Sequence, residues 1–146
     1  MEILETVDET RLTAVLDTLL PPHDGLEGAG GLGLAAAVIA GAREAPHLGE
    51  PAFSALSQVP DGFEALGADE REAQLRAVEA GDGASFGALI NLAYNAYYTD
   101  PRVLERIERR TGYAARPPQP GGYELEPFDE SVLSQVRKRA PFWREV

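Results

Sequence analysis

Hydrophobic residues recur at helical spacing along most of this chain, with polar residues between them. Near the start, Leu12 and Leu16 lie four residues apart, which places both on one face of an α-helix. Thr6 and Glu9 have the spacing of a capping box and predict where that helix begins. The proline pair at 21–22 predicts its end, because proline lacks the amide hydrogen that would continue the helix.

The same periodicity predicts further helices along the chain. Pro60 interrupts the apolar pattern of residues 50–66 and favours two short helices there. Asp100 and Pro101 have the residue types preferred at an N-cap and at the first helical position, and Asp129 can cap a last helix. After the first helix, the predicted helices cover residues 32–43, two segments within 50–66, and residues 68–80, 86–97 and 101–111, and the last helix bears Val132, Leu133 and Val136.

Four of the eleven prolines fall in residues 113–128, which we call the strap. This density of proline excludes a regular helix and favours an extended, partly polyproline path. Tyr113, Tyr123 and Phe128 are spaced along the strap so that they can anchor it on the rest of the protein.

The pattern as a whole is typical of an all-α protein. No segment alternates apolar and polar residues with the period of two that a half-buried strand requires. We therefore expect one domain over residues 1–146, a compact bundle of about six to seven short helices. Its helical body covers residues 1–112, and a C-terminal helix and tail follow the strap at residues 129–146.

The charge of the chain is acidic and unevenly placed. Its formal net charge is -11 and its pI is about 4.6. This balance argues against nucleic acid or an anionic membrane surface as partner, since phosphate binding depends on clustered lysine and arginine. Residues 1–99 hold 4 basic and 16 acidic side chains, whereas residues 100–146 hold 9 basic and 8 acidic ones. The last third therefore suits an acidic partner, but its basic run at residues 137–139 is more typical of a solvated helix end.

Several classes of protein are disfavoured by composition. The absence of cysteine excludes disulfides and thiolate metal sites. No apolar run approaches the roughly 20 residues of a membrane-spanning helix. The first residues are acidic and contain no twin arginine, so we expect a cytoplasmic protein, with periplasmic export alongside a signal-bearing partner as the alternative.

One candidate for small-molecule binding is a glycine-rich segment. Gly28, Gly30 and Gly33 match the G-x-G-x-x-G pattern that lets a dinucleotide approach the start of a helix. That pattern must follow a buried strand, and the residues before it predict a loop, so an interhelical loop is the favoured interpretation. His23 and His47 are the only histidines, both in predicted loops, and a metal site would need more ligands. A binding protein or enzyme that uses this loop is the alternative hypothesis.

Three tyrosines lie just before Asp100. Tyr94 and Tyr97 share the apolar face of their predicted helix, which favours packing in the core, whereas Tyr98 lies off that face and suits an interface. Arg102 stands in the first turn of the next helix, where a cation is unfavourable, and we expect an acidic group to hold it.

These residues resemble a known family. The segments that carry the resemblance are L-D-T-L-L-P-P at 16–22, A-Y-Y-T-D-P-R-V-L at 96–104, G-Y at 112–113 and P-Q-P-G-G-Y at 118–123. They are similar to the gluconate 2-dehydrogenase subunit 3 family, the small subunits of bacterial flavin-dependent sugar and polyol dehydrogenases.

The resemblance implies an accessory role. In that family a large subunit of the glucose-methanol-choline type carries FAD and performs the oxidation, and a haem-containing cytochrome subunit often accepts the electrons. The small subunit binds and stabilises or matures the large one. For this chain we therefore expect no cofactor of its own and no catalysis alone. The residues expected at the partner interface are Tyr97, Tyr98, Asp100, Arg102, Tyr113, Tyr123, Phe128, Phe142 and Trp143.

Overall fold

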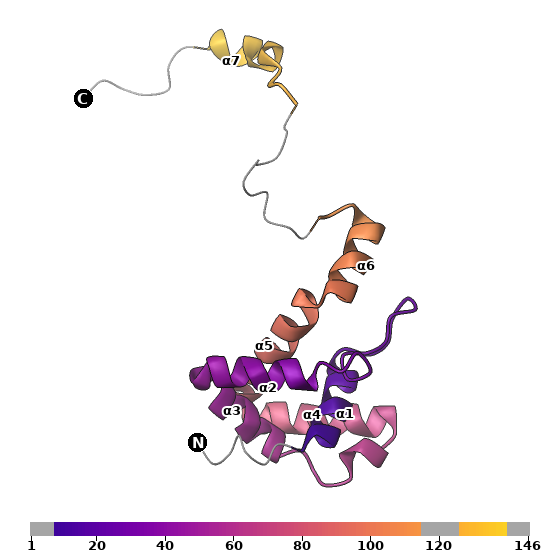
Figure 1. The fold of residues 1–146 in the computed structure, drawn as a ribbon. Helices are drawn as coiled ribbons and strands as arrows, with labels where there is room; N and C mark the ends of the chain where they lie inside the picture. Colours follow the sequence, from indigo (N-terminus) through magenta and orange to yellow (C-terminus); the bar gives the residue numbers. More distant parts are fainter. Residues whose placement is uncertain (1–7, 115–125, 140–146) are drawn as a thin grey trace, which may run out of the picture. The chain divides into compact units, whose positions relative to one another are not determined.

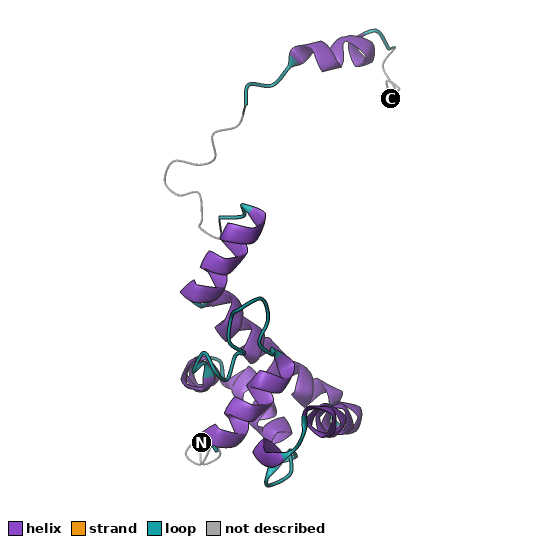
Figure 2. Ribbon diagram, turned by 90° about the vertical axis from the view of Figure 1, so that its right-hand side faces the viewer, coloured by secondary structure: helices purple, strands orange, loops and turns teal. Residues whose placement is uncertain are grey.

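The computed structural model describes residues 8–114 and 126–139, and every regular element in these ranges is helical (Figures 1 and 2). The all-α prediction is thereby confirmed. The chain divides into two units, residues 1–115 and residues 116–146. The first unit holds the α-helices α1 (Glu9–Leu19), α2 (Ala35–Glu44), α3 (Pro46–Ser57), α4 (Ala68–Gly81), α5 (Gly83–Thr99) and α6 (Pro101–Thr111), and the 3-10 turn η2 (Phe63–Ala65). The second holds the 3-10 turn η3 (Glu130–Leu133) and α7 (Ser134–Arg137).

Helix α1 begins differently from the prediction. Asp8, and not a box of Thr6 and Glu9, caps it: the carboxylate accepts hydrogen bonds from the backbone amides of Thr10 at 3.0 Å and Arg11 at 3.2 Å. A capping box needs its glutamate at the third helical position. Because Asp8 is the N-cap, Glu9 is instead the first helical residue. Thr6 lies outside the described residues.

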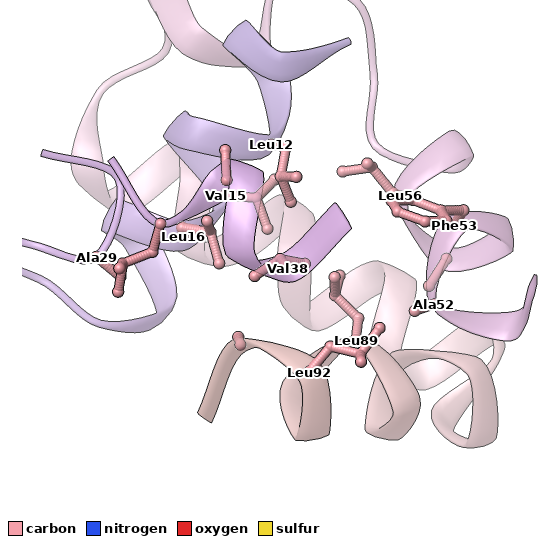
Figure 3. Packing of buried hydrophobic residues seen from close by; sticks show 14 of the residues in the cluster. Leu12, Val15, Leu16, Ala29, Val38, Ala52, Phe53, Leu56, Leu89 and Leu92 are labelled. Carbon is pink, nitrogen blue, oxygen red and sulfur yellow. The ribbon is translucent and has the colours of Figure 1, made fainter. Parts of the chain in front are cut away.

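Helix α5 is the centre of the first unit, with α2, α3, α4 and α6 all packed against it. Figure 3 shows side chains of α1, α2, α3 and α5 meeting in one core. Leu12, Leu16 and Leu89 are fully buried there. Each such leucine contributes about 1.5–3 kcal/mol relative to an exposed one, which makes this core the main source of stability.

Helix α3 starts earlier than its apolar pattern indicates. It begins at Pro46, which suits a first helical position, and it includes Pro51. Its start lies very close to α2: a Cβ added at Gly49 would stand 2.4 Å from the carbonyl oxygen of Ala42. Glycine at that position therefore allows the two helices to approach each other.

The junction of α5 and α6 follows the prediction. Asp100 caps α6 by accepting a hydrogen bond from the Arg102 amide at 2.9 Å, and Pro101 is its first residue. Gly112 ends the helix in the left-handed conformation, with φ of 73°. The side chain of Val103 is only 2% exposed and packs α6 against the core. This junction places the end of α5 and the start of α6 beside each other.

In the second unit, the last predicted helix is present as a 3-10 turn followed by a single α-helical turn. Asp129 caps the turn η3 by accepting a hydrogen bond from the Ser131 amide at 2.9 Å, and η3 leads into the single turn α7. Phe128, Val132 and Val136 are between 57% and 67% exposed, so this unit forms no core of its own within its described residues.

Candidate interaction surface

The last turns of α5 carry an aromatic ridge of Tyr94, Tyr97 and Tyr98. The rings of Tyr94 and Tyr98 meet edge to face with centroids 5.8 Å apart, and those of Tyr97 and Tyr98 do so at 5.2 Å. Edge-to-face pairs are favourable beyond their buried area, so the three rings hold one another in place. Tyr94 is 46% exposed and Tyr98 is 50% exposed.

The core position predicted for Tyr94 is wrong. The buried side of α5 includes Leu89, Leu92 and Ala93. At 100° per residue, Tyr94 lies about 140° around the helix from Leu89, so it faces away from the core. The apolar stripe that the sequence predicts for α5 is broader than the side of the helix that is buried. The apolar residues at its edge, such as Tyr94, therefore remain at the surface.

Tyr97 lies at the margin of the ridge, half-buried and packed against the core. The prediction that Tyr97 packs in the core is therefore confirmed in part. Burial, with a smaller effect from neighbouring Tyr98, raises the pKa of the Tyr97 hydroxyl. The hydroxyl is therefore neutral at physiological pH, and the ring supports Tyr98 through their edge-to-face contact.

Asp100 and Arg102 are paired with each other beside the ridge. The guanidinium donates from Nε to Oδ1 at 2.9 Å and from Nη2 to Oδ2 at 2.8 Å. Hydrogen bonding to Arg102 holds the pKa of the Asp100 carboxyl below its ordinary value. Arg102 Nη2 also donates to the backbone oxygen of Leu32 at 2.8 Å. The acidic group that the sequence predicts for Arg102 is thus Asp100, and both residues support the local structure.

Two further arginines tie α6 to the loop before α2. Arg106 donates to the backbone oxygen of Asp24, and Arg110 forms an ion pair with the Asp24 carboxylate. Together with Arg102 they lie at successive steps of four residues, on one side of α6. That spacing was visible in the sequence, but its target, Asp24, lies 86 residues from Arg110 and gave no signal.

A cavity of about 190 Å³ lies between this loop and the junction of α5 and α6. Leu26, Tyr97, Val103 and Ile107 provide its apolar surface. The polar groups in its lining belong to His23, Asp24, Tyr98, Arg106, Arg110 and Thr111. The groove is thus continuous with the aromatic ridge, since Tyr97 and Tyr98 belong to both.

Two of the three glycines of the G-x-G-x-x-G segment, Gly28 and Gly30, allow close contact with α1. A Cβ on Gly28 would lie 2.3 Å from the Asp17 carboxylate, and one on Gly30 would lie 2.2 Å from the oxygen of Thr13. The amide of Gly31 donates to Asp17 at 3.0 Å. As the favoured interpretation predicts, the segment is an interhelical loop, and what precedes it is a tight turn closed by an isolated bridge between His23 and Leu26.

The histidines occupy two separate elements. His23 Nε2 lies 3.5 Å from Asp24 Oδ2 in the tight turn, whereas His47 is in the first turn of α3 and not in the loop predicted for it. Among the described residues, no group of three or more histidine, aspartate or glutamate side chains could hold a metal ion.

The remaining predicted interface residues belong to the strap and to the C-terminal tail. Tyr113 and Phe128 are 64% and 67% exposed, respectively. Tyr123, Phe142 and Trp143 lie outside the described residues. None of the helices described for residues 8–114 and 126–139 combines the length and apolar character needed to span a membrane.

Comparisons with protein-family models, with curated proteins and with solved structures found no match to this chain. Its membership of the family named above therefore stays a prediction.

Proposed function

We propose that this chain is a non-catalytic subunit that binds and stabilises a larger, FAD-dependent sugar or polyol dehydrogenase. The observation that carries the proposal is the exposed aromatic ridge. Tyr94 and Tyr98 present two mutually fixed rings to solvent at the junction of α5 and α6. Tyrosine is enriched at protein interfaces because it combines a large apolar area with a polar tip at low cost in conformational entropy.

The position of the ridge in the sequence also supports the proposal. One of the segments that resemble the accessory subunits, residues 96–104, includes part of the ridge and the capped start of α6. Its Asp-Pro-Arg residues form the helix start and the Asp100–Arg102 pair. These residues hold the junction in shape, so the segment both presents and orients the rings.

The neighbouring polar groups are engaged within the chain. The guanidinium of Arg102 binds Asp100 and the Leu32 oxygen, and Asp24 binds Arg110. These pairs give the surface a fixed shape before a partner arrives. A preformed surface loses less conformational entropy on association, which favours stable binding.

Co-expression with a glucose-methanol-choline type dehydrogenase from the same genome tests the proposal. We expect the two proteins to elute together from size exclusion, with a light-scattering mass equal to their sum. FAD absorbance should follow the joint peak, and the purified dehydrogenase should lose activity faster at raised temperature when this chain is left out. Separate elution of two folded proteins contradicts the proposal.

A further inference from the structure

The groove beside the aromatic ridge has an apolar interior and a basic border. Leu26, Val103 and Ile107 contribute its aliphatic surface, and Tyr97 adds an aromatic ring to the lining. A volume of about 190 Å³ suits one large apolar side chain better than a folded element. The groove is therefore shaped for an anchor residue projecting from another protein.

The border of the groove carries several arginines. A second hollow shares Asp24, Arg106 and Arg110 with the groove and adds Arg109. The described part of its lining is thus three arginines and one aspartate. Arg109 also pairs with Glu105 one turn back, yet its side chain is 65% exposed, and that of Arg110 is 64% exposed.

Asp24 shows how a carboxylate binds these arginines. Its side chain pairs with Arg110 and its backbone oxygen accepts from Arg106. A guanidinium has five N–H donors, so each arginine keeps donors for a second acceptor. A carboxylate arriving from solvent would find donors of the same kind on the exposed sides of Arg109 and Arg110.

The local charge of α6 favours such an acceptor. Residues 1–99 carry a net charge of -12, from 4 basic and 16 acidic side chains, and α6 stands out from them with four arginines and two glutamates. We propose that the groove receives an apolar side chain flanked by carboxylates, on an acidic segment of the partner protein. This inference rests on the proposed function, because it names the partner segment that the same surface binds.

A peptide experiment tests the recognition chemistry without the dehydrogenase. The probe is a short fluorescent peptide with one leucine between two pairs of glutamates, titrated with the full chain and followed by fluorescence anisotropy. One control peptide replaces the glutamates by glutamines, and another replaces the leucine by serine. We expect each control to bind at least about tenfold more weakly, equivalent to about 1.4 kcal/mol. Binding of the acidic peptide should also weaken with added salt.

Two variants locate the binding site. Arg109→Gln removes a border charge but leaves the contacts to Asp24 intact, and Leu26→Glu places a carboxylate at the groove. Both variants should bind the acidic peptide several-fold more weakly than the wild type. Arg76→Gln is the matched control, since Arg76 pairs with Glu72 on α4 as Arg109 pairs with Glu105 on α6. It should leave binding unchanged.

The results separate this inference from the proposed function. Equal binding of the three peptides, no anisotropy change at the highest soluble concentration, or an equal loss with Arg76→Gln overturns the groove as an acidic anchor site.

If the dehydrogenase complex forms and tolerates both groove variants, the inference fails and the proposed function stands. If the acidic peptide binds as described but no dehydrogenase does, the groove chemistry holds and the identity of the partner is wrong. A dimer of this chain that Leu26→Glu dissociates would replace the partner by a second copy and overturn the inference.

Discussion

Asp100 combines two structural roles in one carboxylate. It caps α6 through the Arg102 amide and forms a double hydrogen bond with the Arg102 guanidinium, while its side chain is only 10% exposed. Because hydrogen bonding to Arg102 lowers the pKa of Asp100 in the folded protein, folding favours the ionised form. This contribution is complete above the ordinary aspartate pKa of about 3.9 and is lost as the pH falls through the lowered folded-state value.

Asp100→Asn should therefore change the dependence of stability on pH. Asparagine still caps a helix, so only the ion pair is lost, and we expect a cost of about 0.5–1 kcal/mol at neutral pH. The difference from the wild type should shrink as the pH falls below about 4. Urea unfolding at a series of pH values measures this effect. Asp100→Ala removes the cap as well and should cost about 1 kcal/mol more. A deficit for the asparagine variant that is the same at every pH would contradict the assignment.

Gly30 illustrates a residue whose role is steric. A Cβ at this position would lie 2.2 Å from the Thr13 oxygen and within 2.8 Å of the Asp17 carboxylate, so α1 or the loop would have to move. We expect Gly30→Ala to destabilise the protein by at least about 1–3 kcal/mol, as overpacking does.

Gly87→Ala provides the control for that substitution. Gly87 lies inside α5, and nothing lies within 4 Å of an added Cβ. Alanine should stabilise this position by about 0.5–1 kcal/mol, because it restricts the unfolded chain and favours the helix. Thermal unfolding followed by circular dichroism compares the two. Similar effects of both substitutions would show that the contact of Gly30 with α1 is unimportant.

At the scale of elements, α6 is attached to the first unit by a small apolar contact and by three arginines. Val103 is its buried residue and Ile107 is partly buried, while Arg102, Arg106 and Arg110 fasten its polar side to the loop before α2. Exposed ion pairs each contribute only about 0–1 kcal/mol. The arginines should therefore control the local order of the loop more than global stability.

Replacing Arg106 and Arg110 together by glutamine tests this expectation. The midpoint of thermal unfolding should change little. In contrast, the backbone amides of residues 26–34, among them that of Gly31, should exchange their hydrogens several-fold faster, because the loop loses its attachment to α6. Hydrogen exchange followed by mass spectrometry measures these exchange rates, and circular dichroism on heating measures the midpoint. Arg109→Gln, which leaves the loop contacts in place, should not alter these rates; unchanged exchange in the double variant would refute the role.

The sequence predicts elements better than it predicts their surroundings. Helix caps and breaks act over a few residues, so Asp100 and Pro101 indicated the start of α6 correctly. The buried side of a helix depends on which neighbours pack there, and so Tyr94 was wrongly placed in the core. The contact of Asp24 with Arg110 joins residues 86 positions apart, a separation about which local periodicity carries no information.

At the scale of the molecule, the acidic body contrasts with a junction that displays tyrosines and arginines. The core accounts for the folding of the first unit, since Leu89 and its neighbours are fully buried. It does not account for the exposure of Tyr94 and Tyr98. Exposed rings of this size, fixed against each other, are costly to leave in water and favourable to cover with protein. The central claim is therefore that this ridge binds a protein partner.

Binding of the purified dehydrogenase by tyrosine variants tests that claim most directly. Isothermal titration should give a Kd at least about tenfold weaker for the double variant Tyr94→Ala with Tyr98→Ala, a loss of about 1.4 kcal/mol or more. The matched variant Tyr94→Phe with Tyr98→Phe keeps both rings and should bind within a few-fold of the wild type. Unchanged thermal unfolding would establish that both variants are folded. If the alanine variant binds as tightly as the wild type, the ridge is not the contact and the account is contradicted.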